Sequence, residues 1–365
     1  MRIVVAPDSF KGSIGAAAAA AALAQGWLSV RPADHLTQFP LADGGEGTLE
    51  VLAAATGAGR WHPAEVTGPG GRRVDSYWLE LPGETHVVEL ARASGLPLLA
   101  APEPLHAHTA GTGELIGRAL DAGARRLLIA LGGSASTDGG TGALAALGAR
   151  FLDAAGRDLP PGGGALAGLA AANLSGLRPP PPDGVRCLTD VRAPLLGPAG
   201  AAAVFGPQKG ADARQVEILE AGLERLADVL GGDPAVPGAG AAGGAAYGFA
   251  TAWGAALTPG AAELCRVAGL DRALAGADLV ITGEGGYDRT SADGKVAGAV
   301  FAAADQAGVP AALVAGVIAA VPPARVVRAV ALADLAGGAA DARASPARWL
   351  RAAGRMLALD LGEKC

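Results

Sequence analysis

Short apolar runs are followed by alanine-rich helical segments at the start of the chain. Residues 2–6 form an apolar run that leads into Pro-Asp-Ser, and the alanine-rich segment after it extends to about residue 28. A second strand is predicted at about residues 35–39, and it leads through a loop into a helical segment that ends at about residue 55. An apolar run followed by a polar loop and a helix is typical of a β-loop-α unit. The N-terminal part is therefore predicted to begin a parallel sheet covered by helices.

The last third of the chain returns to this pattern. Apolar runs at residues 279–282, 311–315 and 329–332 predict strands, with a helix up to about residue 307 between the first two and a final helix at about residues 346–357. With the two N-terminal units this gives about five parallel strands, which is enough for a doubly wound sheet. We therefore predict that both ends of the chain contribute to one α/β domain.

The middle of the chain has a different pattern. From about residue 61, strand-like runs are separated by Gly/Pro turns, which is typical of antiparallel strands. Residues 212–230 carry apolar positions at helical spacing after a capping box, and they predict a core helix. The sequence therefore predicts a discontinuous domain of residues 1–62 and 276–365 with a second domain, residues 63–275, inserted into it.

Composition limits the class of protein. Of the 365 residues, 50% are hydrophobic and 18% are charged, so the chain can bury a substantial core. The longest apolar run, residues 309–321, is too short and too rich in alanine to span a bilayer. Asp8 and Lys11 interrupt the N-terminus too early for a secretory signal, and three widely spaced cysteines indicate free thiols. We therefore expect a cytoplasmic protein without membrane contact.

Charge limits the partners of the chain. A net charge of −6 argues against nucleic acid, because a phosphate backbone requires a basic face. Only four of the 29 basic residues are lysines, and three of these lysines stand beside glycine in predicted loops: Lys11, Lys209 and Lys295. A compact ammonium in such a loop suits a phosphate or a carboxylate, although lysine is also common in solvated loops.

Carboxylates lie among glycines at several predicted strand ends. The second strand leads into LADGGEGT (residues 41–48), and the strand at residues 279–282 leads into GEGGYD (residues 283–288). Glycine N–H groups can hold phosphate oxygens, while carboxylates suit a divalent cation that bridges phosphates. Either loop could also be an ordinary capped helix start. The recurrence of the pattern favours a metal-bridged polyphosphate site.

Two loops of the middle region are candidates for substrate contacts. GGSASTDGG (residues 132–140) follows a predicted strand and offers hydroxyls, including that of Ser134. Asp190 follows another strand ahead of an X-Pro turn. A helix-start loop and an Asx turn explain the two segments equally well, so both interpretations stay open.

One motif suggests a different cofactor. Residues 238–243 match the dinucleotide fingerprint GxGxxG letter for letter. That fingerprint requires a buried strand immediately upstream, which the proline-containing residues 233–237 cannot form. We therefore interpret the match as accidental.

Seven ordered stretches together resemble the bacterial type I glycerate kinases, and they run nearly from end to end. They are APDSFKGS (residues 6–13), LADGGEGT (41–48), GTGELI (111–116), LGGSASTDGG (131–140), FGPQKGA (205–211), PGAGAAGG (237–244) and DLVITGEG (278–285). The resemblance implies ATP-dependent phosphorylation of D-glycerate with Mg²⁺, in a flavodoxin-like domain that carries a second, inserted α/β domain. The chain departs from the family pattern in three places. It has Ser136-Thr137 where the family usually has Thr-Asn, Ala193 where Asn is usual, and Ala297 where Pro is usual.

The resemblance also implies roles for the charged residues. A kinase for a small acid must position its reactants and neutralise their charge. Mg²⁺ is expected to bind some of the carboxylates of Asp43, Glu46, Glu284 and Asp288. Lys11 and Lys295 are expected to bind phosphates or the substrate carboxylate. Asp8 or Asp190 is expected to be the base for the glycerate hydroxyl. The nucleotide is assigned to Gly44, Gly45, Gly47, Gly283, Gly285, Ser134 and Lys209.

Two other functions are considered at this point. A nicotinamide-dependent oxidoreductase would use the match at residues 238–243. A non-catalytic regulator that binds a sugar acid would need a module for DNA or a protein partner, and the sequence shows no basic helix for one. The sequence leaves open whether O2 or O3 of glycerate receives the phosphate.

Overall fold

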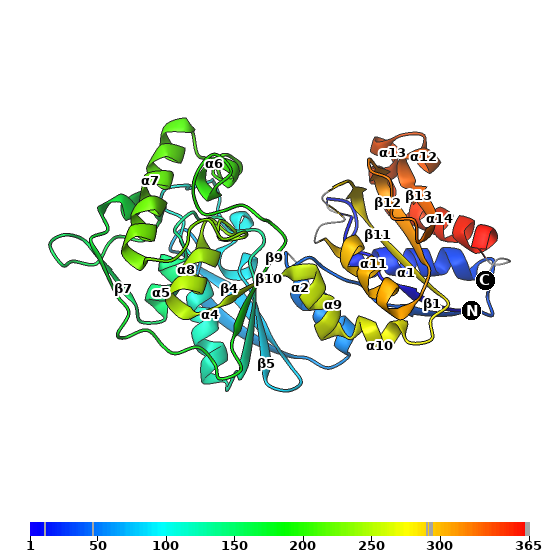
Figure 1. The fold of residues 1–365 in the computed structure, drawn as a ribbon, viewed down its shortest axis with the longest axis horizontal. Helices are drawn as coiled ribbons and strands as arrows, with labels where there is room; N and C mark the ends of the chain where they lie inside the picture. The colour runs from blue at the N-terminus through cyan, green and yellow to red at the C-terminus, as the bar shows by residue number, and fades with distance from the viewer. Residues whose placement is uncertain (11, 46, 290, 292–294, 362–365) are drawn as a thin grey trace. The chain divides into compact units, whose positions relative to one another are not determined.

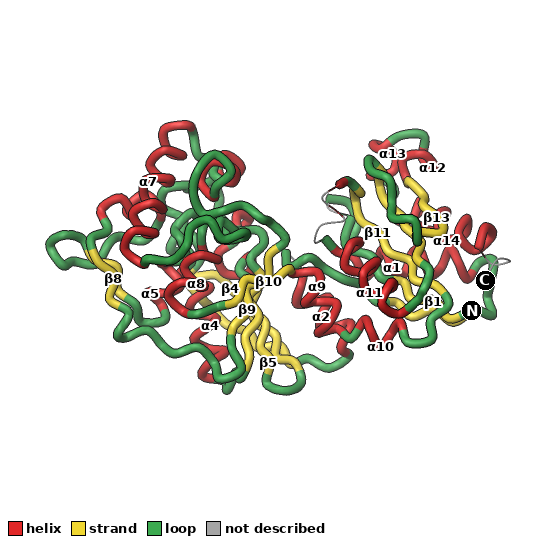
Figure 2. The backbone as a smooth tube through the Cα atoms, in the orientation of Figure 1, coloured by secondary structure: helices red, strands yellow, loops and turns green. Residues whose placement is uncertain are grey.

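The computed structural model describes residues 1–10, 12–45, 47–289, 291 and 295–361 (Figure 1). It divides the chain into two compact units. Unit 1 consists of Met1–Asp43, Glu50–Gly57 and Pro259–Cys365, and unit 2 of Gly44–Leu49 and Ala58–Thr258. Each unit has its own sheet, as the strands in Figure 2 show.

The sheet of unit 1 has five parallel strands in the order β13-β12-β11-β1-β2. The strands are β1 (Arg2–Val5), β2 (His35–Gln38), β11 (Leu279–Tyr287), β12 (Ala311–Ile318) and β13 (Val326–Ala331). Counted within this unit alone, the order is 2-1-3-4-5, which is that of flavodoxin-like folds. Ile3 pairs with Leu279 and Val4 with Val280. The prediction that both ends of the chain build one doubly wound sheet is therefore confirmed.

Helices cover this sheet on both faces. They are α1 (Ala16–Leu28), most of α2 (Thr48–Thr56), α9 (Gly260–Ala268), α10 (Leu270–Leu274), α11 (Val296–Ala307), α12 (Leu332–Ala336), α13 (Ala339–Ala344) and α14 (Pro346–Leu361). Leu279 and Ile281 share a core cluster with Leu23 of α1 and Leu350 of α14. Val280 is equally buried and points to the opposite face, where α11 packs. Burial on both faces explains the apolar runs in the inner strands β1, β11 and β12, whereas the edge strands β2 and β13 are more exposed and include polar residues.

Helices α1 and α14 cross at two glycines. A Cβ atom on Gly26 would lie 2.1 Å from the carbonyl oxygen of Arg351, and one on Gly354 would lie 2.2 Å from that of Leu23. Real Cβ atoms do not approach backbone oxygens so closely. The two glycines therefore allow the helix backbones to pack in direct contact.

We expect Gly26→Ala to destabilise the protein. Alanine favours a helix over glycine by about 1 kcal/mol, but overpacking costs about 1–3 kcal/mol or more, and here the clash is with rigid backbone. Urea denaturation followed by circular dichroism should show the loss. Gly117→Ala in a helix of unit 2 is the control, because its Cβ would make only ordinary contacts, at 3.6 Å and beyond. Gly117→Ala should be at least as stable as the parent protein. A Gly26→Ala variant with the stability of the parent protein would contradict the expected backbone clash.

The sheet of unit 2 has six strands in the order β10-β9-β6-β5-β4-β3. They are β3 (Arg60–Thr67), β4 (Arg73–Leu81), β5 (Thr85–Glu89), β6 (Arg126–Ala130), β9 (Val185–Thr189) and β10 (Ala256–Pro259), and a separate antiparallel pair joins β7 (Arg150–Leu152) to β8 (Ala171–Asn173). Strands β3, β4 and β5 are antiparallel, as predicted, but β5, β6 and β9 run parallel. The carboxyl ends of these three parallel strands therefore lie at one edge of the sheet.

The helices of unit 2 pack around one hydrophobic cluster. They are α3 (Ala91–Ser94), α4 (Ala110–Asp121), α5 (Thr141–Ala146), α6 (Ala201–Phe205), α7 (Ala213–Leu230) and α8 (Ala245–Trp253), with 3-10 turns at Leu96–Leu98, Gly163–Gly168 and Pro207–Lys209. The predicted core helix is α7, and its capping box of Asp212 and Gln215 is present. None of the helices in the described part of the chain has the length and apolarity that a membrane crossing requires.

The division into units differs from the predicted domain boundaries in three places. Residues 259–275 are predicted to belong to the inserted domain of residues 63–275, but α9 and α10 pack against α11 and belong to unit 1. Residues 44–49 and residues 58–62 lie within the predicted segment 1–62 but belong to unit 2. These differences arise from contacts between segments that are distant in the sequence.

Candidate active site

A cavity of about 220 Å³ lies in unit 1, and we call it the unit 1 cavity. Its lining includes Asp8 after β1, Asp43 after β2, Glu284 of β11 and Gly316 of β12. These residues lie at the carboxyl ends of parallel strands, on both sides of the point where the strand order reverses between β1 and β11. Open α/β sheets bind their ligands at this position.

Strand β11 extends further than predicted. The sequence suggested a loop from residue 283, but pairing with β12 continues to Tyr287. Glycine makes this possible, because a Cβ atom on Gly283 would lie 2.0 Å from the carbonyl oxygen of Val314. Gly283 therefore serves strand packing and does not line the cavity, whereas Gly285 does.

Charged groups of both signs line the unit 1 cavity. Asp8, Asp43 and Glu284 are each 6% exposed. Lys295 precedes α11 and extends its ammonium to 4.0 Å from Glu284 and 3.8 Å from Asp288. Lys295 is therefore shared between two of the carboxylates that were assigned to a metal.

A divalent cation would have to share its coordination with a ligand here. Among the residues that the structure describes, no group of three His, Cys, Asp or Glu side chains is placed to hold a metal ion. Mg²⁺ bound to nucleotides uses one or two carboxylates together with phosphate oxygens and water. Asp43 and Glu284 fit that pattern. Glu46 and Lys11, which were also predicted to belong to this site, lie outside the described residues.

The glycine loop after β2, residues 44–49, is part of unit 2 and packs on other segments of that unit. The N–H of Gly132 donates to the carbonyl of Gly44 at 3.3 Å, and a Cβ atom on Gly132 would lie 2.5 Å from the Cα atom of Gly45. The N–H of Gly47 donates to the carboxylate of Glu89 at 3.2 Å. Gly44 and Gly47 have the positive φ angles that glycine allows. In this structure the Gly47 N–H therefore serves the protein itself, and its role as a phosphate donor stays a prediction.

Sequence reasoning missed two charged residues. Glu89 is 1% exposed and ends the fully buried strand β5. A carboxylate at the end of a fully buried strand was the available signal. Arg343 of α13 is exposed and lines the unit 1 cavity. Its sequence neighbourhood resembles an ordinary surface helix, and nothing in it marked the residue.

A second cavity, of about 350 Å³, lies in unit 2 at the ends of β6 and β9, and we call it the unit 2 cavity. Its polar lining includes Ser134, Asp190 and Lys209, all of which the sequence had singled out, as well as Gly44. Much of the remaining wall is apolar, from Leu96, Pro97, Leu131, Leu188, Val191, Phe205, Ala241 and Ala242. Those predicted site residues that line a cavity thus form two groups, one around each cavity.

Lys209 is the most buried cation of this cavity, with 3% of its surface exposed. Its ammonium donates to the hydroxyl of Ser134 at 3.2 Å and to the carbonyl of Ser136. Burial lowers the pKa of Lys209 to about 8, although nearby Asp138 acts in the opposite direction. Its environment therefore disfavours the charged form relative to water.

Asp138 is a structural carboxylate. It is fully buried and accepts hydrogen bonds from the N–H and hydroxyl of Thr109, at 2.9 and 2.8 Å, and from the N–H groups of Gly140 and Gly142, each at 3.2 Å. These bonds join the start of α4 to the start of α5. The helix-start interpretation of this loop is therefore correct for Asp138.

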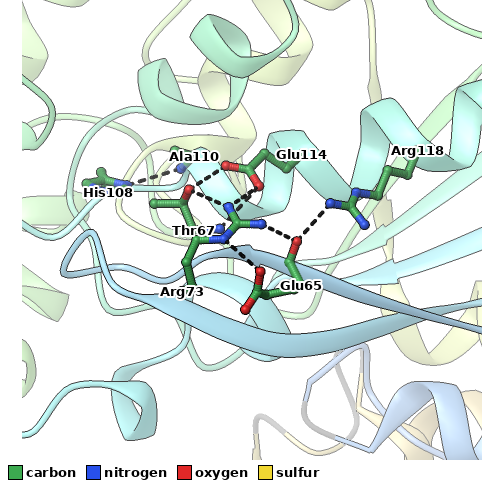
Figure 3. Close-up of polar contacts among 7 residues, drawn as sticks. All are labelled: Glu65, Thr67, Arg73, His108, Ala110, Glu114 and Arg118. Atoms are coloured by element: carbon green, nitrogen blue, oxygen red, sulfur yellow. Dashed lines mark hydrogen bonds and ion pairs between the residues drawn. The ribbon is translucent and has the colours of Figure 1, made fainter.

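The GTGELI stretch fixes α4 to the β3–β4 hairpin. Figure 3 shows Arg73 among Glu65, Thr67 and Glu114, where Glu114 accepts from the Thr67 hydroxyl at 2.5 Å and from Arg73 at 3.0 Å. Burial acts to raise the pKa of Glu114, but the hydrogen bonds from Thr67 and Arg73 together outweigh this effect. The pKa of Glu114 therefore lies below its ordinary value. A Cβ atom on Gly111 would lie 2.1 Å from the Thr67 carbonyl oxygen. This motif therefore supports the loop that carries Asp138.

The dinucleotide fingerprint at residues 238–243 is a packing element. Turns precede it where the fingerprint requires a strand. A Cβ atom on Gly240 would lie 2.2 Å from the Pro194 carbonyl oxygen, and one on Gly243 would lie 2.1 Å from that of Ser136. Close backbone contacts thus explain these two glycines without a nicotinamide cofactor.

Known proteins resemble this chain over nearly its whole length. The model of the glycerate kinase family matches residues 3–361. A glycerate kinase from Bacillus subtilis (strain 168) is 44% identical over 332 residues, which cover 87% of this chain and 85% of the relative. Glycerate 2-kinase from Escherichia coli (strain K12) is 42% identical over 305 residues, 81% of this chain and 80% of the relative. A solved structure from Salmonella typhimurium LT2, of a protein assigned as glycerate kinase 2, has 38% sequence identity and a TM-score of 0.83, with both chains covered completely.

Proposed function

This chain belongs to the glycerate kinase family, and we propose that it transfers the terminal phosphoryl group of ATP to a hydroxyl of D-glycerate, as a type I member. The observation that carries the proposal is the unit 1 cavity at the reversal point of the sheet. There, separate strand ends and the loops after them place Asp8, Asp43, Glu284 and Lys295 around one space. Such loops support phosphoryl transfer, because the reaction depends on positioning and charge neutralisation.

We assign the nucleotide phosphates to the unit 1 cavity. Lys295 would bind phosphate oxygens as a point charge, and the backbone at Gly285 borders the same space. Asp43 and Glu284 would hold Mg²⁺, with Glu46 and Asp288 as further candidates. When bound, the ion neutralises the charge of the β- and γ-phosphates. Arg343 adds a positive charge that the sequence had not indicated.

Asp190 is our choice as the base for the substrate hydroxyl. It lines the unit 2 cavity together with Lys209, whereas Asp8 lines the cavity assigned to the phosphates. The Asp8 carboxylate accepts a hydrogen bond from the N–H of Ser9 at 2.6 Å. Asp8 therefore suits charge neutralisation near the metal better than proton transfer.

One assay tests the function and the position of transfer. Purified protein with ATP, Mg²⁺ and D-glycerate should produce ADP and phosphoglycerate, identified by ³¹P and ¹H NMR. We propose 2-phosphoglycerate, because the E. coli relative is named glycerate 2-kinase. Absence of phosphorylated product from D-glycerate would contradict the function, and 3-phosphoglycerate would contradict only the position.

We also propose that the protein acts in the cytoplasm. Within the described part of the chain, Cys187 and Cys265 are buried free thiols. Burial raises the pKa of the Cys187 thiol strongly and that of Cys265 to about 12. Unpaired cysteines are typical of proteins in a reducing compartment.

A further inference from the structure

The buried ammonium of Lys209 is incompletely satisfied. A lysine ammonium has three hydrogen-bond donors. Within the described part of the chain, two of them go to neutral oxygens of Ser134 and Ser136, and no ion pair to Lys209 is present. A buried charge without an opposite charge at contact distance is costly. Lys209 therefore has both the spare donor and the electrostatic preference to bind an anion.

The neighbouring acid is already committed to the protein. Asp138 attracts the Lys209 charge, but its carboxylate oxygens accept hydrogen bonds from Thr109, Gly140 and Gly142. These bonds fix Asp138 between two helix starts. An anion that enters the unit 2 cavity therefore does not have to displace an existing ion pair to reach Lys209.

The loop that binds Lys209 carries two more unpaired polar groups. Among the described residues, the hydroxyls of Ser136 and Thr137 are buried and have no hydrogen-bond partner. Neither residue is part of the described lining of the unit 2 cavity. The polar groups of this region that a ligand in the cavity can reach therefore include those of Ser134, Asp190 and Lys209.

We propose that the unit 2 cavity is the acceptor site and that Lys209 binds the carboxylate of the hydroxy acid, with Asp190 facing its hydroxyl. This inference rests on the proposed function and changes the sequence-based assignment of Lys209 and Ser134 to the nucleotide. The side chains of Lys209 and Asp190 both line the unit 2 cavity. One cation and one base match the two ends of a 2- or 3-hydroxy acid.

Charge favours a carboxylate over a nucleotide phosphate at this position. ATP brings about four negative charges and normally a metal ion, whereas the described lining of the cavity offers one cation and also carries the acid Asp190. A single carboxylate needs only one cation. The apolar remainder of the wall also suits a small ligand with few polar groups.

The test compares D-glycerate with D-glyceramide, in which an uncharged amide replaces the carboxylate. Lys209→Met keeps most of the length of the side chain, which becomes one atom shorter, and removes its charge. We expect kcat/KM for D-glycerate to fall by about 10²- to 10³-fold, and kcat/KM for D-glyceramide to change little. Calorimetry without ATP should show the corresponding loss of D-glycerate binding. Lys209→Gln is the second variant if Lys209→Met folds poorly by circular dichroism.

Lys295→Met is the matched control in unit 1. It should raise the KM for ATP and leave the discrimination between the acid and the amide unchanged. If Lys209→Met instead raises the KM for ATP and leaves D-glycerate binding intact, Lys209 contacts a nucleotide phosphate and the inference is wrong. Equal losses for the acid and the amide would also contradict it. If the parent enzyme does not phosphorylate D-glycerate, the proposed function fails, independently of these variants.

The affinity for D-glycerate should depend on pH. Lys209 has a pKa of about 8, and Asp138 and Asp190 are the acids that face it or share its cavity. Below this pH the ammonium is charged and the Kd should be constant. Above it the ammonium loses its proton, and the Kd should rise toward about tenfold per pH unit. Calorimetry between pH 6.5 and 9.5 measures this, and a profile that Lys209→Met leaves unaltered would contradict the assignment.

Discussion

Replacing Asp43 with Asn and Glu284 with Gln is expected to raise the Mg²⁺ concentration needed for half-maximal activity by about tenfold or more for each change. Both carboxylates are nearly buried and line one cavity from separate strand ends. Because Mg²⁺ at a nucleotide site uses few protein ligands, the loss of one carboxylate leaves a large share of the coordination unfilled. The measurement is ADP release as a function of Mg²⁺ at saturating ATP and D-glycerate.

The double variant separates a shared ion from two independent effects. Two ligands of one ion act as a unit, so the combined loss should be smaller than the product of the single losses. Asp334→Asn, which changes an exposed carboxylate of α12 outside the cavity, is the control and should leave the Mg²⁺ dependence unchanged. Strictly multiplicative losses, or variants that do not respond to Mg²⁺, would show that the two residues do not share the cation.

The fold could be predicted largely from local patterns. Strands β1 and β6 are short apolar runs, and α7 is defined by its spacing and by the Asp212 cap. Such elements carry their own signals, because burial on both faces of a parallel sheet requires continuous apolar residues. The change from βα units to antiparallel strands near residue 61 also indicated the insertion.

Features that depend on distant contacts could not be predicted. The end of β11 contains Gly283, Gly285 and Gly286, which suggest a loop, and only the neighbouring strand β12 makes them a strand. Helices α9 and α10 belong to unit 1 because of their packing against α11. Glycine patterns report where backbone must come close, but not whether its neighbour is a ligand or another strand.

The residue types of the candidate site could be predicted better than their grouping. Asp43, Glu284 and Lys295 border one cavity, and Asp190, Ser134 and Lys209 border another. The sequence had assigned Ser134 and Lys209 to the nucleotide, because an isolated lysine near glycine suits any anion. The strand order decides which loops meet, and that order arises from pairing between distant segments.

Asp190→Asn is expected to lower kcat by about 10²- to 10⁴-fold, the range for loss of general-base assistance. Asparagine has a similar shape but cannot accept the proton of the glycerate hydroxyl. Because Asp190 lines the unit 2 cavity, the KM for ATP and the dependence on Mg²⁺ should stay close to those of the parent enzyme. A loose transition state for phosphoryl transfer needs less help from a base, so an effect near the lower limit is consistent with this role.

The pattern across variants decides the role of Asp190, more than the size of any single effect. Asp183→Asn is the control in unit 2, since Asp183 is an exposed carboxylate that pairs with Arg125 and should leave kcat unchanged. Asp8→Asn should alter the response to Mg²⁺ and ATP, because Asp8 lines the unit 1 cavity. The assignment is overturned if high Mg²⁺ restores the activity of Asp190→Asn while Asp43→Asn and Glu284→Gln do not respond to Mg²⁺. In that case the carboxylate of the unit 2 cavity binds the metal, and the base must be sought among the acids of the unit 1 cavity, beginning with Asp8.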